Sequence, residues 1–271
     1  MKTNALFACP ILLCALNSTM AANDRAAVVP SIPDNAISGE VPLVPRRKFG
    51  SVVDTAYSFQ LNGKKVGDRW HYESGVLAQE RIFDGEVRHG KTTEFYPNGQ
   101  IFSEHPYDHG LRDGPCIYWT QEGKEIGRSL MRRGSGLLRE FKPTGELARS
   151  CFYQNGKRHG RYTEWSVAVG NGKPRYETLS YENDIAHGWV IQYTHDHILV
   201  SEAMFQDGPL HGAIRSWNRV GVLIDGTPKY YIKGAGEVSK DAFERAAASD
   251  PVLRRSLNFI SRVPAKKQQG K

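Results

Sequence analysis

The sequence predicts an all-β fold: an elongated, single-layer antiparallel β-meander of stacked hairpin repeats with a short helical C-terminal cap. Three observations predict it. Glycines recur at a nearly constant spacing through the middle of the chain, an aromatic residue follows each of them at a fixed distance, and both patterns stop before a C-terminal segment of helical character. The 271 residues include 27 glycines and 12 tyrosines, which is typical of an ordered chain rich in strands and turns.

The chain begins with the features of a secretory signal. Lys2 precedes the apolar run ALFACPILLCAL, and NSTMAA follows it with small residues at the expected cut. The apolar run is shorter than the roughly 20 residues of a membrane-spanning helix, and it contains Pro10. We therefore predict a cleavable signal peptide over residues 1–21 and a periplasmic or secreted mature protein.

Residues 22–57 are expected to form a linker or a strand-like arm. This segment contains Pro30, Pro33, Pro42 and Pro45 and shows little periodicity of apolar residues. Closely spaced prolines favour an extended chain over a packed helix. The first repeat is expected to begin after this arm.

Seven glycines open seven repeat units across residues 58–234. Successive glycines are 22 to 28 residues apart, and a period of this length is typical of an array of supersecondary units. The glycines are Gly67, Gly90, Gly114, Gly136, Gly160, Gly188 and Gly212.

An aromatic residue stands five positions after each of these glycines, although aromatic residues make up only 10% of the chain. Such rings can pack on one another as core, or they can line a trough and contact a peptide, lipid or glycan. A single sheet has no second layer to cover both of its faces, so both interpretations stay open. The candidate binding residues are Tyr72, Phe95, Trp119, Phe141, Trp165, Tyr193 and Trp217.

Further glycines divide each unit into strand, turn, strand and turn. YPNGQ and KPTGE are hairpin signals, because Gly adopts positive φ at little cost. The stretch QNGKRHG at residues 154–160 has counterparts in FDGEVRHG, YENDIAHG and QDGPLHG. It is therefore predicted to join one hairpin to the next. It lacks the G-x-x-x-x-G-K-[ST] pattern of a phosphate-binding loop.

The recurring NGK-x-HG followed by Y/W-x-x-x-G resembles the bacterial MORN-variant repeat over roughly residues 58–234. The resemblance implies β-hairpins stacked into a twisted trough, and some proteins with this repeat are antitoxin-like. Two stretches depart from the pattern. The insertion SVAVGNGKPRYETLSYEND lengthens the fifth unit, and THDH replaces a turn glycine in the sixth. We therefore expect irregularity between residues 166 and 198.

Candidate catalytic and metal-binding residues are explained by the repeat. Five of the nine histidines precede turn glycines, and Glu80, Glu104 and Glu202 share one position of the unit. The pair His195 and His197 with Asp196 between them could bind a metal ion, but such a cluster is also typical of a polar loop. No G-x-S-x-G or H-E-x-x-H motif occurs. We predict no catalytic residues, no metal site and no cofactor.

Cys116 and Cys151 are the only cysteines expected in the mature protein. Counting strands along the predicted meander places them three strands apart. At about 4.8 Å per strand this separates them by roughly 14 Å. A disulfide requires Cα atoms within about 7 Å. We therefore predict two free thiols.

The chain changes character after Gly234. Ser239 is suited to cap a helix and Pro251 to begin a second one, so a helical cap is predicted over residues 235–262. Residues 263–271 form a basic tail. The net charge is +7, and the last eighteen residues contain six cations and no acid. The rest of the chain is close to neutral, so nucleic acid is not an expected partner.

These features predict a non-catalytic exported repeat scaffold that binds a macromolecular partner in the bacterial envelope, with a protein as the favoured partner. The resemblance alone implies a sharper version, an immunity or antitoxin-like protein that neutralises a toxin. The alternative is an envelope factor that binds anionic lipid or glycan through the aromatic trough and the basic tail.

Overall fold

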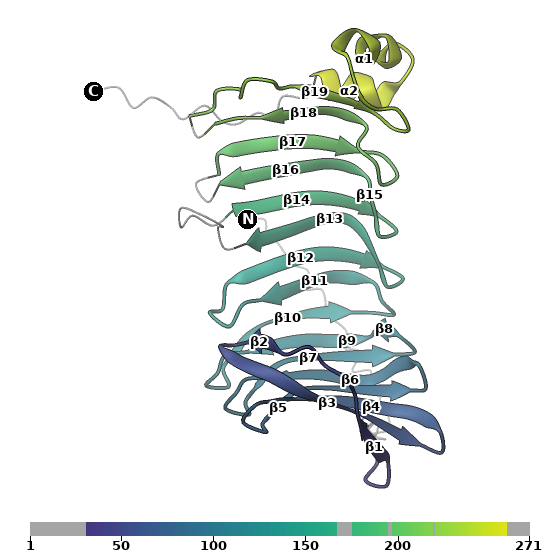
Figure 1. Ribbon diagram of the computed structural model, residues 1–271, viewed down its shortest axis with the longest axis vertical. Helices are drawn as coiled ribbons and strands as arrows, with labels where there is room; N and C mark the ends of the chain where they lie inside the picture. The colour runs from purple at the N-terminus through teal and green to yellow at the C-terminus, as the bar shows by residue number, and fades with distance from the viewer. Residues whose placement is uncertain (1–30, 167–174, 195–196, 219, 259–271) are drawn as a thin grey trace, which may run out of the picture.

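The structure is a computed structural model that describes residues 31–166, 175–194, 197–218 and 220–258. Its strands stack one after another along the long axis, and two helices lie at the C-terminal end (Figure 1). All strand pairs are antiparallel, and the prediction of an all-β meander with a helical cap is confirmed. The predicted signal peptide and the basic tail lie outside the described residues.

Within the described residues the secondary structure consists of short strands and two eight-residue helices. In chain order the elements are β1 Ile37–Glu40, β2 Arg46–Lys48, β3 Ser51–Leu61, β4 Lys64–Tyr72, β5 Leu77–Asp84, β6 Val87–Phe95, β7 Ile101–Asp108, β8 Leu111–Arg112, β9 Gly114–Trp119, β10 Glu125–Met131, β11 Gly136–Phe141, β12 Leu147–Gln154, β13 Lys157–Ser166, β14 Arg175–Glu182, β15 Ile185–Ala186, β16 Gly188–Thr194, β17 Leu199–Phe205, β18 Gly212–Ser216, β19 Lys229–Ile232, β20 Gly236–Val238, α1 Lys240–Ala247 and α2 Pro251–Asn258.

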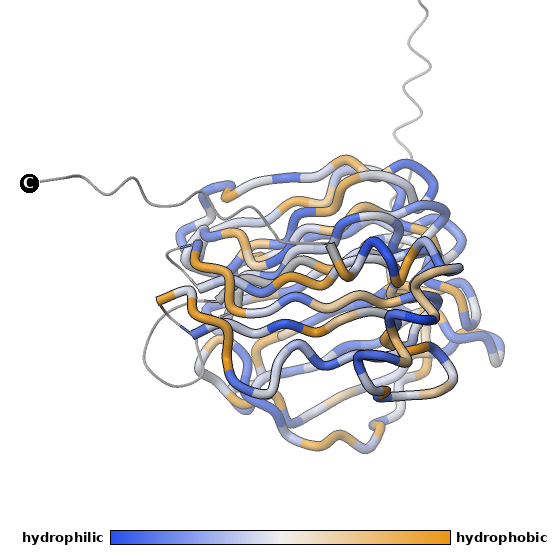
Figure 2. The backbone as a smooth tube through the Cα atoms, turned by 90° about the horizontal axis from the view of Figure 1, so that it is seen from above, coloured by the Kyte–Doolittle hydropathy of each residue, from blue (hydrophilic) through white to orange (hydrophobic). Residues whose placement is uncertain are grey.

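The strands follow chain order through two consecutive sheets. The first sheet has the order β1-β3-β4-β5-β6-β7-β9-β10, with β2 paired to β3 and β8 to β7. The second runs β11-β12-β13-β14-β16-β17-β18-β19-β20, with β15 paired to β14. An isolated bridge between Arg132 and Ser135 closes the turn from β10 to β11. Seen along the stack, apolar and polar residues alternate along the strands (Figure 2).

The stretch QNGKRHG is a hairpin turn, as its recurrence predicts. Gln154 pairs with Lys157, and Asn155 and Gly156 between them have φ values of 52° and 81°. Two consecutive positive φ values in a two-residue loop are those of a type I′ turn. The turn also contacts its neighbour, because the Gly156 N–H donates to the Gly134 carbonyl at 2.9 Å. Turns of successive hairpins are thus joined along the stack.

The N-terminal segment adds strands to the sheet and folds over one of its faces. Phe49 lies between β2 and β3, with its ring centroid 4.9 Å from that of Tyr96 and 4.8 Å from that of Phe102. Ile32 packs so closely on Gly67 that a Cβ atom there would lie 2.2 Å from the Ile32 Cδ1. Gly67 is therefore required for this approach.

The two departures from the repeat do not interrupt the sheet. The insertion lengthens a hairpin, in which β13 and β14 pair continuously from Gly160 opposite Tyr181 to Ser166 opposite Arg175. In the THDH stretch His197 takes the place of the turn glycine, with a φ of 59°. Its N–H donates to the Thr194 carbonyl, as the turn glycines do in other units. Within the described part of residues 166–198, the expected irregularity is limited to the hairpin length and this turn.

The helical cap forms as its local sequence predicts. The Ser239 side chain accepts a hydrogen bond from the Ala242 N–H, and Pro251 is the first residue of α2. Phe243, Ala247 and Leu253 form a buried cluster between the helices and the last strands. Among the described helices, none is long and apolar enough to span a membrane.

Cys116 and Cys151 are both buried and unbridged, as predicted. Cys116 lies on β9 and Cys151 on β12, three strands further along the stack. Burial raises the pKa of each thiol to about 11. Both side chains therefore remain protonated and unreactive at neutral pH.

Candidate functional site

The seven aromatic residues that the repeat spacing selects are called the aromatic column. Their side chains are divided between the core and partly exposed positions. Tyr72 is 1% exposed and belongs to a buried cluster with Val53 and Ala78. The other six rings, which are partly buried, are Phe95, Trp119, Phe141, Trp165, Tyr193 and Trp217.

The first unit is offset by one residue from the others. Tyr72 and Tyr96 make the same turn contact, since each backbone N–H donates at 2.8 Å to a carbonyl four residues later. Their hydroxyls also match: Tyr72 donates to the Phe95 carbonyl at 2.7 Å, and Tyr96 to the Trp119 carbonyl at 2.9 Å. Tyr72 is therefore equivalent to Tyr96, and His71 takes the column position.

The structure brings together a different set of rings from the column. Tyr96, Phe102 and Tyr118 form a buried cluster, and Phe141 is the column member that packs against it. The ring centroids of Tyr118 and Phe141 are 5.5 Å apart. Phe102 lies at a β-bulge between β6 and β7, where the pairing shifts by one residue. Sequence spacing misses it because the equivalent bulge residues of other units, Ala78 and Ala148, carry no ring.

A polar cleft of about 270 Å³ opens beside this ring cluster and spans β5 to β12. A second cleft of similar volume adjoins it and shares Glu140 and Arg149. We call the two together the polar groove. The first cleft is lined by Gln79, Arg81, Arg88, Thr92, Glu94, Phe102, Ser103, His105, Tyr107, Arg112, Tyr118, Glu140, Phe141, Ala148 and Arg149.

The two glutamates of this cleft already have partners. Glu94 accepts from Lys48 at 3.1 Å and from Gln79 at 2.8 Å. Glu140 is paired with the Arg149 guanidinium. The charges of both glutamates are therefore largely compensated by groups within the protein.

The other three arginines of the cleft contact rings instead of carboxylates. The guanidinium of Arg81 lies 4.5 Å from the centroid of the Trp70 ring. Arg88 and Arg112 lie 5.0 Å and 5.5 Å from the Tyr107 ring centroid. None of the three forms an ion pair with any residue in the described part of the chain.

Several buried polar atoms in this cleft have no hydrogen-bond partner among the described residues. Burial of such an atom without a partner is unfavourable by about 1–3 kcal/mol. Sequence patterns give no signal for this set, because its members come from β5, β6, β7 and β8. The atoms are Gln79 Oε1, Arg81 Nε, Thr92 Oγ1, His105 Nδ1 and Arg112 Nε.

His105 makes the cleft sensitive to acid. Burial, and secondarily the charges of Arg112 and Arg88, lower the pKa of His105 to about 3. An unfolded histidine binds its proton near pH 6.5, so between pH 6.5 and 3 the unfolded state holds more protons than the folded state. The contribution of neutral His105 to stability is therefore present above pH 6.5 and is lost as the pH falls towards 3.

We expect His105→Gln to reduce the loss of melting temperature between pH 7 and pH 4. His109→Gln is the matched control, because that side chain is largely exposed in the same pair of hairpins. Thermal unfolding at both pH values, followed by circular dichroism, measures the difference. An identical acid-induced loss in the wild type and His105→Gln would contradict a buried neutral imidazole.

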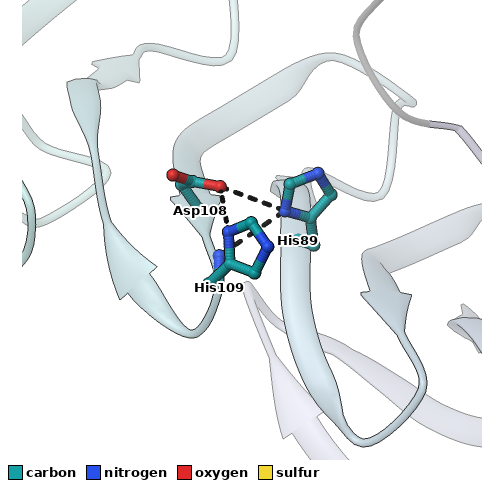
Figure 3. A group of neighbouring side chains, drawn as sticks. All are labelled: His89, Asp108 and His109. Atoms are coloured by element: carbon teal, nitrogen blue, oxygen red, sulfur yellow. Dashed lines mark hydrogen bonds and ion pairs between the residues drawn. The ribbon is translucent and has the colours of Figure 1, made fainter.

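A second polar cluster lies at the turn end of the same hairpins (Figure 3). Asp108 Oδ1 lies 3.2 Å from His89 Nδ1 and 2.7 Å from His109 Nδ1. Three such groups have the donor types that bind a divalent transition ion. A similar contact of 3.3 Å joins His187 to Asp207 in a later unit. In both places a His–Asp contact ties neighbouring turns together. The structural role of these histidines stays a prediction.

The THDH stretch, a candidate metal site, lies partly outside the described residues. Residues 195 and 196 lie outside the described residues, whereas His197 forms the turn after β16.

The glutamates that share one position of the unit form cross-strand ion pairs. Glu80 pairs with Arg69 at 2.7 Å and Glu104 with Lys91 at 3.0 Å.

The opposite face of the sheet carries an apolar row. Leu130, Leu137 and Phe152 are exposed on the successive strands β10, β11 and β12, and Leu137 pairs directly with Phe152. Successive residues of a strand point to opposite faces. Leu137 therefore points away from the groove, which Leu138 and Glu140 line.

A comparison with known protein families supports the hairpin repeat that the glycine spacing predicts. No curated protein matches the chain at a significant level. Residues 88–109 match a family model described as MORN repeat variant, and they span β6, β7 and the following turn. This match to one of the stacked hairpins supports placing the chain among the MORN-repeat proteins.

Proposed function

We propose that the protein is an exported, non-catalytic repeat scaffold that binds a protein partner in the bacterial envelope through the polar groove. The observation that carries the proposal is the set of buried polar atoms without partners in one cleft. Native proteins satisfy most buried polar groups, so a cluster of exceptions favours a binding surface. The N-terminal signal pattern supports export.

An extended single layer of strands is suited to this role. Its faces offer a long surface on which hairpins of similar shape carry different side chains. The groove supplies charge and hydrogen-bond donors on one face, while the apolar row of Leu130, Leu137 and Phe152 offers a second contact. The partly exposed rings of the predicted column remain candidate contacts. The resemblance to antitoxin-like relatives favours a toxin as the partner, which would make the chain an immunity protein.

Site-specific photo-cross-linking in producing cells tests the proposal. We expect a photo-reactive residue at Ala148, which lines the groove, to form an adduct with one discrete protein. The control is the same residue at Glu122, an exposed turn position that lines neither cleft and is not part of the apolar row. Equal adducts at both positions, or no protein adduct at Ala148 in a folded variant, would contradict partner binding through the groove.

A specific observation favours the lipid alternative. Val220, Val222, Leu223 and Ile224 form an exposed apolar loop near the C-terminal end of the stack. Such a loop, together with the basic tail, is suited to the interface of an anionic membrane. Co-sedimentation with phosphatidylglycerol vesicles, but not with phosphatidylcholine vesicles, and loss of binding in Val222→Ser would support this function over the protein-binding one.

A further inference from the structure

We infer that the polar groove is an anion site that takes the carboxylate of an acidic side chain from the protein partner, held by Arg88, Arg112 and Thr92. The inference rests on the proposed function and names the chemistry of the partner. It depends on the charge balance of the cleft, on its unpartnered polar atoms and on its size.

The charge balance of the cleft is positive. Its lining contains four arginines and two glutamates, which leaves a surplus of two positive charges, since burial keeps His105 neutral. One arginine is paired with Glu140, and Glu94 is paired with Lys48. Arg88 Nη1 donates to the Tyr107 hydroxyl at 2.9 Å. The remaining donors of Arg88 and those of Arg112 can bind a carboxylate, which the planar fork of a guanidinium matches.

Two of the cleft arginines, Arg81 and Arg88, lie close enough to repel each other. The pKa of Arg81 is lowered, first by burial and then by the charge of Arg88. The charges of Asp68 and Glu94 raise it in part. The charges of Arg88 and Arg112 both act on His105. A bound anion would relieve this repulsion, because opposite charges within a few ångströms stabilise each other.

The unpartnered atoms on the cleft floor are suited to the same ligand. The Thr92 hydroxyl and the Nε–H of Arg112 can each donate a hydrogen bond to an oxygen. Gln79, Thr92 and His105 are 6%, 7% and 9% exposed. A side chain that projects from a peptide can enter the cleft and reach groups this deeply buried. The headgroups of a planar bilayer would stay at the opening of the cleft. This favours an acidic peptide over a lipid surface.

The cleft is large enough to admit an anchoring side chain. Its volume is about 270 Å³. Phe102, Tyr107, Tyr118 and Phe141 provide walls for the methylene groups of such a side chain. The adjoining cleft continues the groove towards Tyr162, so an extended segment can follow it past the anchor.

Isothermal titration calorimetry of the mature chain with an octaglutamate peptide tests the inference. We expect binding of octaglutamate and none of octaglutamine. Arg88→Gln and Arg112→Gln should each weaken binding by about tenfold or more, because each removes a charge-assisted hydrogen bond. Arg139→Gln is the matched control and should change Kd by less than about twofold, since its exposed side chain is adjacent in sequence to groove-lining residues but belongs to neither cleft.

Thr92→Val separates binding from folding. Valine has nearly the shape of threonine and lacks the hydroxyl that has no partner in the described structure. We expect this variant to melt at a higher temperature than the wild type and to bind octaglutamate several-fold more weakly. A purely structural hydroxyl would instead lower the melting temperature when removed and leave binding unchanged, and that result would overturn its role in the site.

Three further outcomes would overturn the inference. Equal affinity for octaglutamate and octaglutamine would remove the need for an anion. Unchanged affinity in Arg88→Gln and Arg112→Gln would place the peptide elsewhere. Displacement of octaglutamate by phosphatidylglycerol vesicles, with the same dependence on both arginines, would assign the site to lipid headgroups. If the Ala148 adduct survives in Arg88→Gln, partner binding stands and only the anion anchor fails.

Discussion

Replacing Arg215 by methionine is expected to lower the free energy of unfolding by about 3–5 kcal/mol, because it removes one partner of a buried ion pair. Arg215 Nη1 donates to Glu202 Oε1 at 2.9 Å, and the Glu202 side chain is 0% exposed. The other guanidinium nitrogen donates to the Ser256 and Leu257 carbonyls at 2.8 and 3.0 Å. The same side chain thus stabilises a buried carboxylate and fixes the end of α2 on the sheet.

Denaturant unfolding monitored by circular dichroism measures this loss. Arg139→Met is the control, because that side chain is exposed on another strand of the second sheet. Replacing Glu202 and Arg215 together by methionine should lower the free energy of unfolding less than Arg215→Met alone. The double variant leaves no buried carboxylate without its cation. A single variant as stable as the Arg139→Met control would show that the cap is held by its apolar cluster.

The parts of the fold that depend on local sequence could be predicted. The Asn155–Gly156 turn, the Ser239 cap and the Pro251 helix start each follow from the conformational preferences of a few neighbouring residues. The separation of Cys116 from Cys151 follows from counting strands in a meander. These features need no knowledge of contacts between distant segments.

The parts that depend on register could not be predicted. A fixed spacing from Gly67 selects Tyr72, but the β4–β5 pairing shifts three residues after Gly67, whereas the β6–β7 pairing shifts four residues after Gly90. The position shared by Glu80, Glu104 and Glu202 is visible in the sequence, whereas the full burial of Glu202 arises only when the cap packs on β18. The groove is missed because its lining combines several positions of the repeat: Arg88 and Arg112 each stand two residues before a repeat-opening glycine, whereas Arg81 and Arg149 stand elsewhere in their units.

The ring cluster leads to the second large effect, which distinguishes the observed core from the predicted column. Tyr118→Ala should lower the free energy of unfolding by about 3–5 kcal/mol, the range for removing a large buried ring. Tyr118 is 4% exposed and packs edge-on against Phe102, His105 and Phe141. Three neighbouring hairpins lose contacts when this ring is removed.

Trp119→Ala should lower the free energy of unfolding less than Tyr118→Ala does, although Trp119 is the larger residue and the one that the repeat spacing selects. The Trp119 side chain is only partly buried. Trp119 contacts the preceding unit through its backbone carbonyl, which accepts from the Tyr96 hydroxyl and is kept in Trp119→Ala and in Tyr118→Ala. Tyr118→Phe is a further control and should change stability little, because it keeps the ring. Urea unfolding of the three variants gives the order directly. A Trp119→Ala variant less stable than Tyr118→Ala would mean that the column, and not the Tyr118 cluster, carries the packing between hairpins.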